Sequence, residues 1–157
     1  MNRAISTIRN WFRLSLQGRD QVPVLLPVLL ASERHDDYQV LQALLHDTKW
    51  SVARALSWNE VSRFCESAAH PVVLVDRHFQ GSNWQSTVSS LLDPAANRCV
   101  ILLSDVSDPY LWNELVQQGG FDVLARPFER HEVLRALAFA QRHSTTGWPS
   151  LHVPRQQ

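Results

Sequence analysis

Residues 71–76 read PVVLVD, an apolar run that ends in a single carboxylate, Asp76. Two other runs share this pattern, because PVLLAS at 27–32 and CVILLS at 99–104 are apolar up to a polar last residue. Runs of Val, Ile and Leu without polar alternation are typical of strands that are buried on both faces. Such strands occur in parallel sheets covered by helices on both sides, so these three runs predict an α/β fold.

Longer segments with helical periodicity separate the runs and complete an alternating pattern of strands and helices. Two more short β-type runs bring the predicted strands to five, in the order (βα)5. The strands are predicted at Pro27–Ser32, Ser51–Leu56, Pro71–Asp76, Cys99–Ser104 and Phe121–Ala125.

Several helix boundaries are marked by residues that stabilise helix ends. Ser57 with Glu60, and Ser82 with Gln85, match the capping-box pattern at a helix start. Asp108 precedes a proline, which is tolerated at the first position of a helix, and the glycines at 119–120 end that helix. The first helix is predicted at about residues 36–47 and the last at 129–143.

The composition suits one soluble domain in a reducing compartment. The chain has 157 residues, 45% of them hydrophobic, and its 15 basic residues balance 15 acidic ones. This balance argues against a global attraction to nucleic acid or to an anionic membrane. The two cysteines, Cys65 and Cys99, lie in apolar runs without metal-site spacing, which indicates buried free thiols and a cytoplasmic location.

The chain divides into three parts. Residues 22–143 form the predicted domain, and residues 144–157 a flexible C-terminal tail. Residues 1–21 are predicted to form a basic amphipathic helix and a linker. That helix could pack on its own domain or on a second copy, or it could contact a partner or a membrane surface. Four arginines stand against one acidic residue in this segment: Arg3, Arg9, Arg13 and Arg19.

Polar side chains gather where the predicted strands end. In an open parallel sheet the carboxyl ends of the strands meet in one crevice, which is where functional groups collect. This crevice would contain three acids, two hydroxyls and a cation. Such a set can accept a phosphoryl group, because a carboxylate attacks, acids hold Mg²⁺, and the hydroxyl and the cation bind phosphoryl oxygens. The residues are Ser32, Glu33, Asp76, Ser104, Asp105 and Arg126.

The chain resembles the response-regulator receiver family over roughly residues 24–143. VVLVD ending at Asp76 matches the family's phospho-acceptor, Ser104 its Thr/Ser position, and RPF at 126–128 its Lys-Pro-Phe signature. Twenty-two positions separate Ser104 from Arg126, as in the family, and Pro127 resembles its cis-proline. The resemblance implies a doubly wound, flavodoxin/CheY-like sheet of order 2-1-3-4-5. It also implies a site in which Asp76 is the nucleophile and Glu33 and Asp76 bind Mg²⁺.

The sequence departs from this family pattern at four positions. Ser32 replaces the first acid, which predicts weak or lost Mg²⁺ binding, although Asp36 or Asp37 could supply an oxygen instead. Arg126 replaces a lysine and could pair with Asp76 through both branches of its guanidinium. Asp105 stands where a small residue is usual and either repels phosphate or pairs with Arg126. Val123 replaces the aromatic residue that many members use as a rotamer switch.

The resemblance predicts a stand-alone receiver of a two-component phosphorelay that works by protein docking, and not an enzyme. Its partners would be a sensor histidine kinase, another signalling protein or a second copy of the chain, bound at the face that contains the predicted strand 121–125. Nucleic acid and membranes are not expected partners. The alternative is a pseudo-receiver that needs no phosphorylation and binds a partner or a membrane surface through residues 1–21. A flavodoxin-like enzyme is disfavoured, because SERH at 32–35 replaces a glycine-rich phosphate loop.

Overall fold

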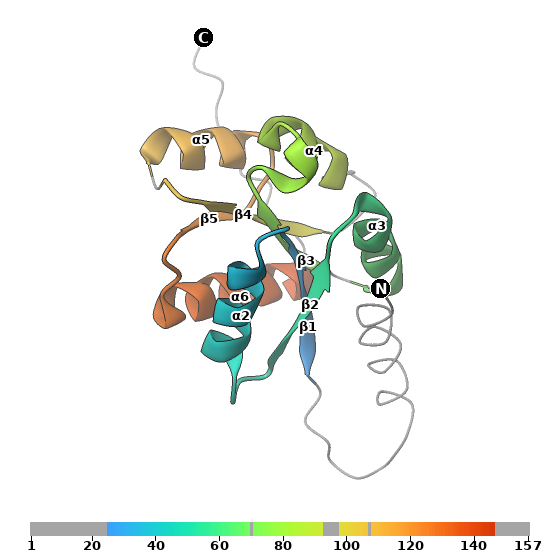
Figure 1. Ribbon diagram of the computed structural model, residues 1–157, viewed down its shortest axis with the longest axis vertical. Coiled ribbons are helices and arrows are strands. Elements are labelled where there is room, and N and C mark those ends of the chain that lie inside the picture. Colours follow the sequence, from blue (N-terminus) through green and yellow to red (C-terminus); the bar gives the residue numbers. More distant parts are fainter. Residues whose placement is uncertain (1–24, 70, 93–97, 107, 147–157) are drawn as a thin grey trace.

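The computed structural model describes residues 25–69, 71–92, 98–106 and 108–146. The predicted N-terminal helix and most of the predicted C-terminal tail therefore lie outside the described residues. Within them, five parallel strands form one sheet in the order β2-β1-β3-β4-β5, which confirms the predicted topology (Figure 1). The strands are β1 (Leu26–Ala31), β2 (Trp50–Ala55), β3 (Val72–Asp76), β4 (Cys99–Ser104) and β5 (Asp122–Ala125).

Helices cover both faces of this sheet (Figure 1). One face packs against α2 (His35–Leu45) and α6 (Arg130–Thr146) through a core that includes Leu41 and Leu137. The other packs against α3 (Trp58–Ser67), α4 (Trp84–Leu91) and α5 (Pro109–Gln117), where Val61, Val88 and Leu115 are buried. Because both faces are covered, β3 and β4 are buried along their whole length, as the unbroken apolar runs predicted.

The five strands differ from their predicted bounds by no more than one residue, whereas some helix ends differ more. The start of α4 was predicted wrongly: its N-cap is Asn83, which accepts a hydrogen bond from the Gln85 backbone, and Ser82 follows a short 3₁₀ turn, η1 (Phe79–Gly81). An asparagine side chain caps as well as a serine, so Asn83 can cap the helix although Ser86 does not complete a capping box. Helix α6 also continues past the predicted end at His143 to Thr146.

Helix α2 ends at Leu45, two residues before its predicted end, whereas the predicted N-caps of α3 and α5 are confirmed. Ser57 accepts a hydrogen bond from the Glu60 amide, and Asp108 accepts one from Leu111. The turn after α5 leaves no room at Gly120, since a Cβ there would lie 2.3 Å from the Leu115 side chain. Among the described residues, no helix is both long and apolar enough to cross a bilayer.

Candidate functional site

The carboxyl ends of β1, β3, β4 and β5 bring the predicted site residues to one edge of the sheet. Asp76 at the end of β3 lies opposite Leu103, and Ser104 at the end of β4 lies opposite Ala125. The Arg126 amide donates to the Ser104 carbonyl oxygen at 2.9 Å, which fixes the residue after β5 beside β4. The peptide bond that follows, between Arg126 and Pro127, is cis, as the sequence resemblance implied.

The Arg126 side chain extends into this edge and is only 11% exposed. Its Nε and Nη2 donate to the two carboxylate oxygens of Asp37, at 2.8 and 2.7 Å. Nη2 also donates to Oδ2 of Asp76. Arg126 thus bridges two carboxylates, and its two-pronged pairing is with Asp37, whereas the sequence suggested such a pairing with Asp76.

Asp37 reaches the site from the first turn of α2, where it is 3% exposed. The Ser32 hydroxyl donates to Asp37 Oδ2 at 2.7 Å and accepts from the Arg34 amide at 3.1 Å. Burial by itself would raise the pKa of Asp37, but hydrogen bonds from Arg126 and Ser32 and the charge of Arg126 outweigh it and lower the pKa. Asp37 is therefore an ionised, fully hydrogen-bonded carboxylate.

Both carboxylate oxygens of Asp76 are engaged. Oδ1 accepts from the His78 amide at 2.8 Å, and Oδ2 accepts from Arg126. Burial by itself would lower the pKa of Arg126, yet its bonds to Asp37 and Asp76 raise it, so the guanidinium stays charged at every physiological pH. The buried cluster of Asp37, Asp76 and Arg126, which we call the Arg126 cluster, contains two negative charges and one positive charge.

Asp105, in the loop after β4, lies on the exposed side of the Arg126 cluster. Its side chain is 62% exposed and pairs with Arg34 at 3.0 Å and with Arg126 at 3.5 Å. The pairing with Arg126 was one of two roles considered from the sequence. The other role, repulsion of an incoming phosphate, stays a prediction.

Ser104 is buried, and its hydroxyl accepts from the Val106 amide at 3.1 Å. In the described part of the chain this hydroxyl makes no hydrogen bond to Asp76 or Arg126. Ser104 lies at the same sheet edge as the Arg126 cluster but outside its hydrogen-bond network. Its role towards a phosphoryl group stays a prediction, as does the consequence of Val123, which is half-buried in β5.

The Glu33 side chain contacts Gln80 and not the Arg126 cluster. It is exposed and accepts a hydrogen bond at 2.7 Å from Gln80, which also donates to the Leu56 carbonyl oxygen. The Glu33 carbonyl oxygen accepts from Arg54 at 3.0 Å, which holds the β1–α2 loop against β2. The structure therefore does not join the Glu33 carboxylate to the Arg126 cluster, and its role as a metal ligand stays a prediction.

The donor set does not fit the Mg²⁺ ion that the resemblance implies. Asp37 and Asp76 share a guanidinium that would repel a dication, and Glu33 is bound to Gln80. Within residues 25–146 as described, no three His, Cys, Asp or Glu side chains are grouped so that they could hold a metal.

Sequence reasoning missed Arg34, Arg54 and Gln80 and named Asp37 only as an alternative. One signal could have identified Asp37, because it precedes Leu41 and Leu45 at steps of four on the buried stripe of α2. A carboxylate on such a stripe must find a buried partner. Arg34, Arg54 and Gln80 carry no comparable signal, since their partners come from distant loops.

Solved structures share this arrangement of strands and helices. A response regulator from Thermotoga maritima has a TM-score of 0.64 at 20% identity, covering 74% of this chain and 97% of its own. The receiver domain of an HD domain-containing protein from Pseudomonas fluorescens Pf-5 gives 0.65 at 20% identity, with 77% and 98% covered. The Vibrio cholerae chemotaxis protein CheY4 gives 0.63 at 18% identity, with 74% and 98% covered.

The likeness lies in the fold and not in the overall sequence. No family model matches the sequence, and no curated protein matches it. These three structures are nevertheless covered almost completely by this chain, and they have the receiver-domain fold. The chain therefore has the fold of the response-regulator receiver domains.

Proposed function

We propose that this chain is a receiver-like signalling module that acts by docking to other signalling proteins and is held in one state by Arg126. The bridge from Arg126 to Asp37 and Asp76 carries the proposal. In a phosphorylated receiver, a phosphoryl group on the aspartate supplies the charge that the switch residues bind. Here Asp37 and Asp76 already supply the negative charge that Arg126 binds, so the module needs no phosphoryl group to keep these side chains ordered.

The hydrogen bond from Arg126 also prevents Asp76 from acting as a nucleophile. An aspartate attacks phosphorus through a free lone pair, and attack in line requires an open approach to that oxygen. Both Asp76 oxygens accept charge-assisted or backbone hydrogen bonds, and the side chain is only 10% exposed. Freeing Oδ2 would leave a buried guanidinium with one partner fewer, which is costly in a site of low dielectric.

Weak or lost Mg²⁺ binding fits the same proposal. Mg²⁺ requires anionic oxygens in near-octahedral geometry and gives up its water reluctantly. Ser32 supplies no charge and is already bonded to Asp37. Among the described residues, the buried carboxylates at this sheet edge are Asp37 and Asp76, and a metal ion would have to displace Arg126 from both.

The side of the domain formed by α5, β5 and α6 offers a surface suited to docking another protein. Tyr110 and Trp112 on α5 are 82% and 46% exposed, and large exposed aromatic side chains are typical anchors at protein interfaces. Beside them runs a groove of about 640 Å³ along β5, the edge strand of the sheet. We assign this face to a protein partner or a second copy of the chain, and we assign the module no metabolic catalysis. The groove includes Asp108, Asp122, Arg126, Glu129, Glu132 and Arg135.

A titration with beryllofluoride and Mg²⁺, followed by amide NMR, tests the proposal. Beryllofluoride mimics a phosphoryl group on a receiver aspartate, so a conventional receiver shows saturable shifts around Asp76, Ser104 and β5. We expect the titration to leave the wild-type spectrum unchanged. The spectrum of Asp76→Asn should be equally insensitive to beryllofluoride and Mg²⁺. Saturable shifts that Asp76→Asn abolishes would overturn the proposal in favour of a phosphorylated receiver served by a histidine kinase.

A further inference from the structure

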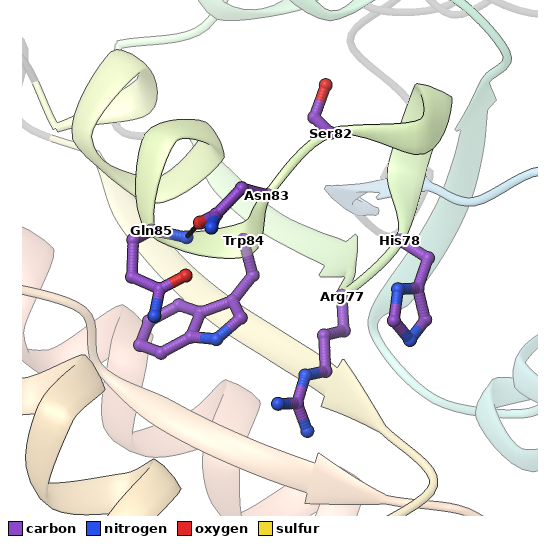
Figure 2. Close-up of a pocket in the computed structure, with 6 residues that line it drawn as sticks. All are labelled: Arg77, His78, Ser82, Asn83, Trp84 and Gln85. Carbon is purple, nitrogen blue, oxygen red and sulfur yellow. Dashed lines mark hydrogen bonds between the residues drawn. The ribbon is translucent and has the colours of Figure 1, made fainter.

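A second hollow lies beside the Arg126 cluster but shares no residue with it. It has a volume of about 300 Å³ and lies between the end of β3 and the start of α4 (Figure 2). Asp37, Asp76 and Arg126 are not among its lining residues. The six side chains around it include two bases and four neutral groups, and no carboxylate: Arg77, His78, Ser82, Asn83, Trp84 and Gln85.

Arg77 is the unusual member of this set. Its side chain is half-buried, yet it makes no hydrogen bond or ion pair with any described residue, whereas Arg34, Arg54 and Arg126 all have partners. None of its guanidinium nitrogens is among the buried atoms that lack a partner, so the charged group remains open to a ligand. An anion in the hollow would supply both the missing charge and the missing acceptor.

Trp84 offers a second donor. The residue is only 5% exposed, and its indole N–H makes no hydrogen bond to a described residue. The indole nitrogen is not among the buried atoms that lack a partner, so this donor is open to solvent and to a ligand. Figure 2 shows the indole nitrogen on the edge of the ring towards Arg77, with both side chains extending to the same side of the chain that connects β3 to α4.

From the unpaired Arg77 guanidinium and the Trp84 indole N–H in one carboxylate-free hollow, we propose that this site binds an oxyanion, the phosphate or carboxylate group of a small molecule. Arg77 supplies the charge, and the planar fork of its guanidinium matches two oxygens of such a group. Trp84 supplies a directional donor from a rigid ring. Asn83 is not part of the donor set, because its side-chain oxygen accepts from the Gln85 amide. The site is independent of whether Asp76 is phosphorylated.

The test is a titration of the full chain with inorganic phosphate, observed through the indole ¹H–¹⁵N signals of the tryptophans. Sodium chloride keeps the ionic strength constant, and Trp84→Phe identifies the Trp84 signal. We expect a saturable shift of that signal. Arg77→Gln should weaken the binding at least about tenfold, because a hydrogen bond to a charged group contributes about 1.5 kcal/mol or more. Arg63→Gln, at an exposed arginine on α3, is the matched control and should bind as the wild type does.

Sodium acetate in a parallel titration separates a planar carboxylate from a tetrahedral phosphate as the preferred group, and saturable binding of either supports the site. A shift that grows linearly without saturation, or equal affinity in Arg77→Gln and the wild type, overturns it. Asp76→Asn should still bind phosphate at Arg77 and Trp84. A failure of the oxyanion site can therefore be distinguished from a failure of the proposed function.

Discussion

Arg126 donates hydrogen bonds to both carboxylate oxygens of Asp37, at 2.8 and 2.7 Å, although the two residues are 89 positions apart in sequence. This pairing joins the end of β5 to the first turn of α2 through the interior of the site. Asp76 lies against the same guanidinium, so the residue expected to react is part of a structural cluster. Removing Arg126 would leave two buried carboxylates without a counter-charge, whereas removing either aspartate would leave one ion pair.

Replacement of Arg126 by Met should destabilise the protein strongly. The change leaves Asp37 and Asp76 as two buried carboxylates without a counter-charge, which typically costs about 3 kcal/mol or more. Urea unfolding followed by circular dichroism measures the free energy of unfolding. Arg34→Met is the control, because its ion pair with Asp105 is largely exposed and contributes less than about 1 kcal/mol. Equal losses in the two variants would show that the cluster is not a stabilising element.

Acid should lower the free energy of unfolding, because it protonates Asp37 and removes the contribution of its carboxylate. The pKa of Asp37 is lower in the folded protein than in the unfolded chain, so the unfolded chain binds more protons as the pH falls. The contribution of Asp37 is therefore complete above about pH 4 and is lost below it. Urea unfolding of the wild type and Asp37→Asn between pH 6 and pH 3 measures this effect. The two stability curves should converge as the pH falls, and curves that stay parallel would contradict the prediction.

The fold could be predicted from local sequence, whereas the site could be predicted only in part. Runs such as 71–76 are buried on both faces, and this burial alone requires a covered parallel sheet. The strand ends also had to meet, so Asp76, Ser104 and Arg126 were found together. The partner of Arg126 depends on side-chain direction between β5 and α2, and no local pattern encodes that. Glu33 likewise lies next to the expected pocket in sequence, but its carboxylate turns to Gln80.

Two substitutions together should create a Mg²⁺ response. Ser32→Asp supplies the missing acid, and Arg126→Lys replaces the two-pronged fork with a single ammonium that cannot hold Asp37 and Asp76 in the same way. We expect saturable Mg²⁺-dependent amide shifts around β1 and β3 in the double variant and none in the wild type. Arg126→Lys alone is the control for loss of the fork without the added acid. An unresponsive double variant with a native circular dichroism spectrum would mean that Arg126 and Ser32 do not account for weak metal binding.

The two thiols should be almost unreactive until the protein unfolds. Burial raises the pKa of Cys99 to about 12, with a further contribution from the negative charge of Asp122, and burial also raises the pKa of Cys65. Because the thiolate is the reactive form, Cys99 in the folded protein should react at pH 8 about a thousandfold more slowly than an ordinary cysteine. Reaction with a disulfide reagent, with and without urea, measures this difference, and Cys65→Ala isolates the signal of Cys99. Rapid labelling of native Cys65→Ala at pH 8 would place Cys99 outside the buried start of β4, where it is paired with Val72.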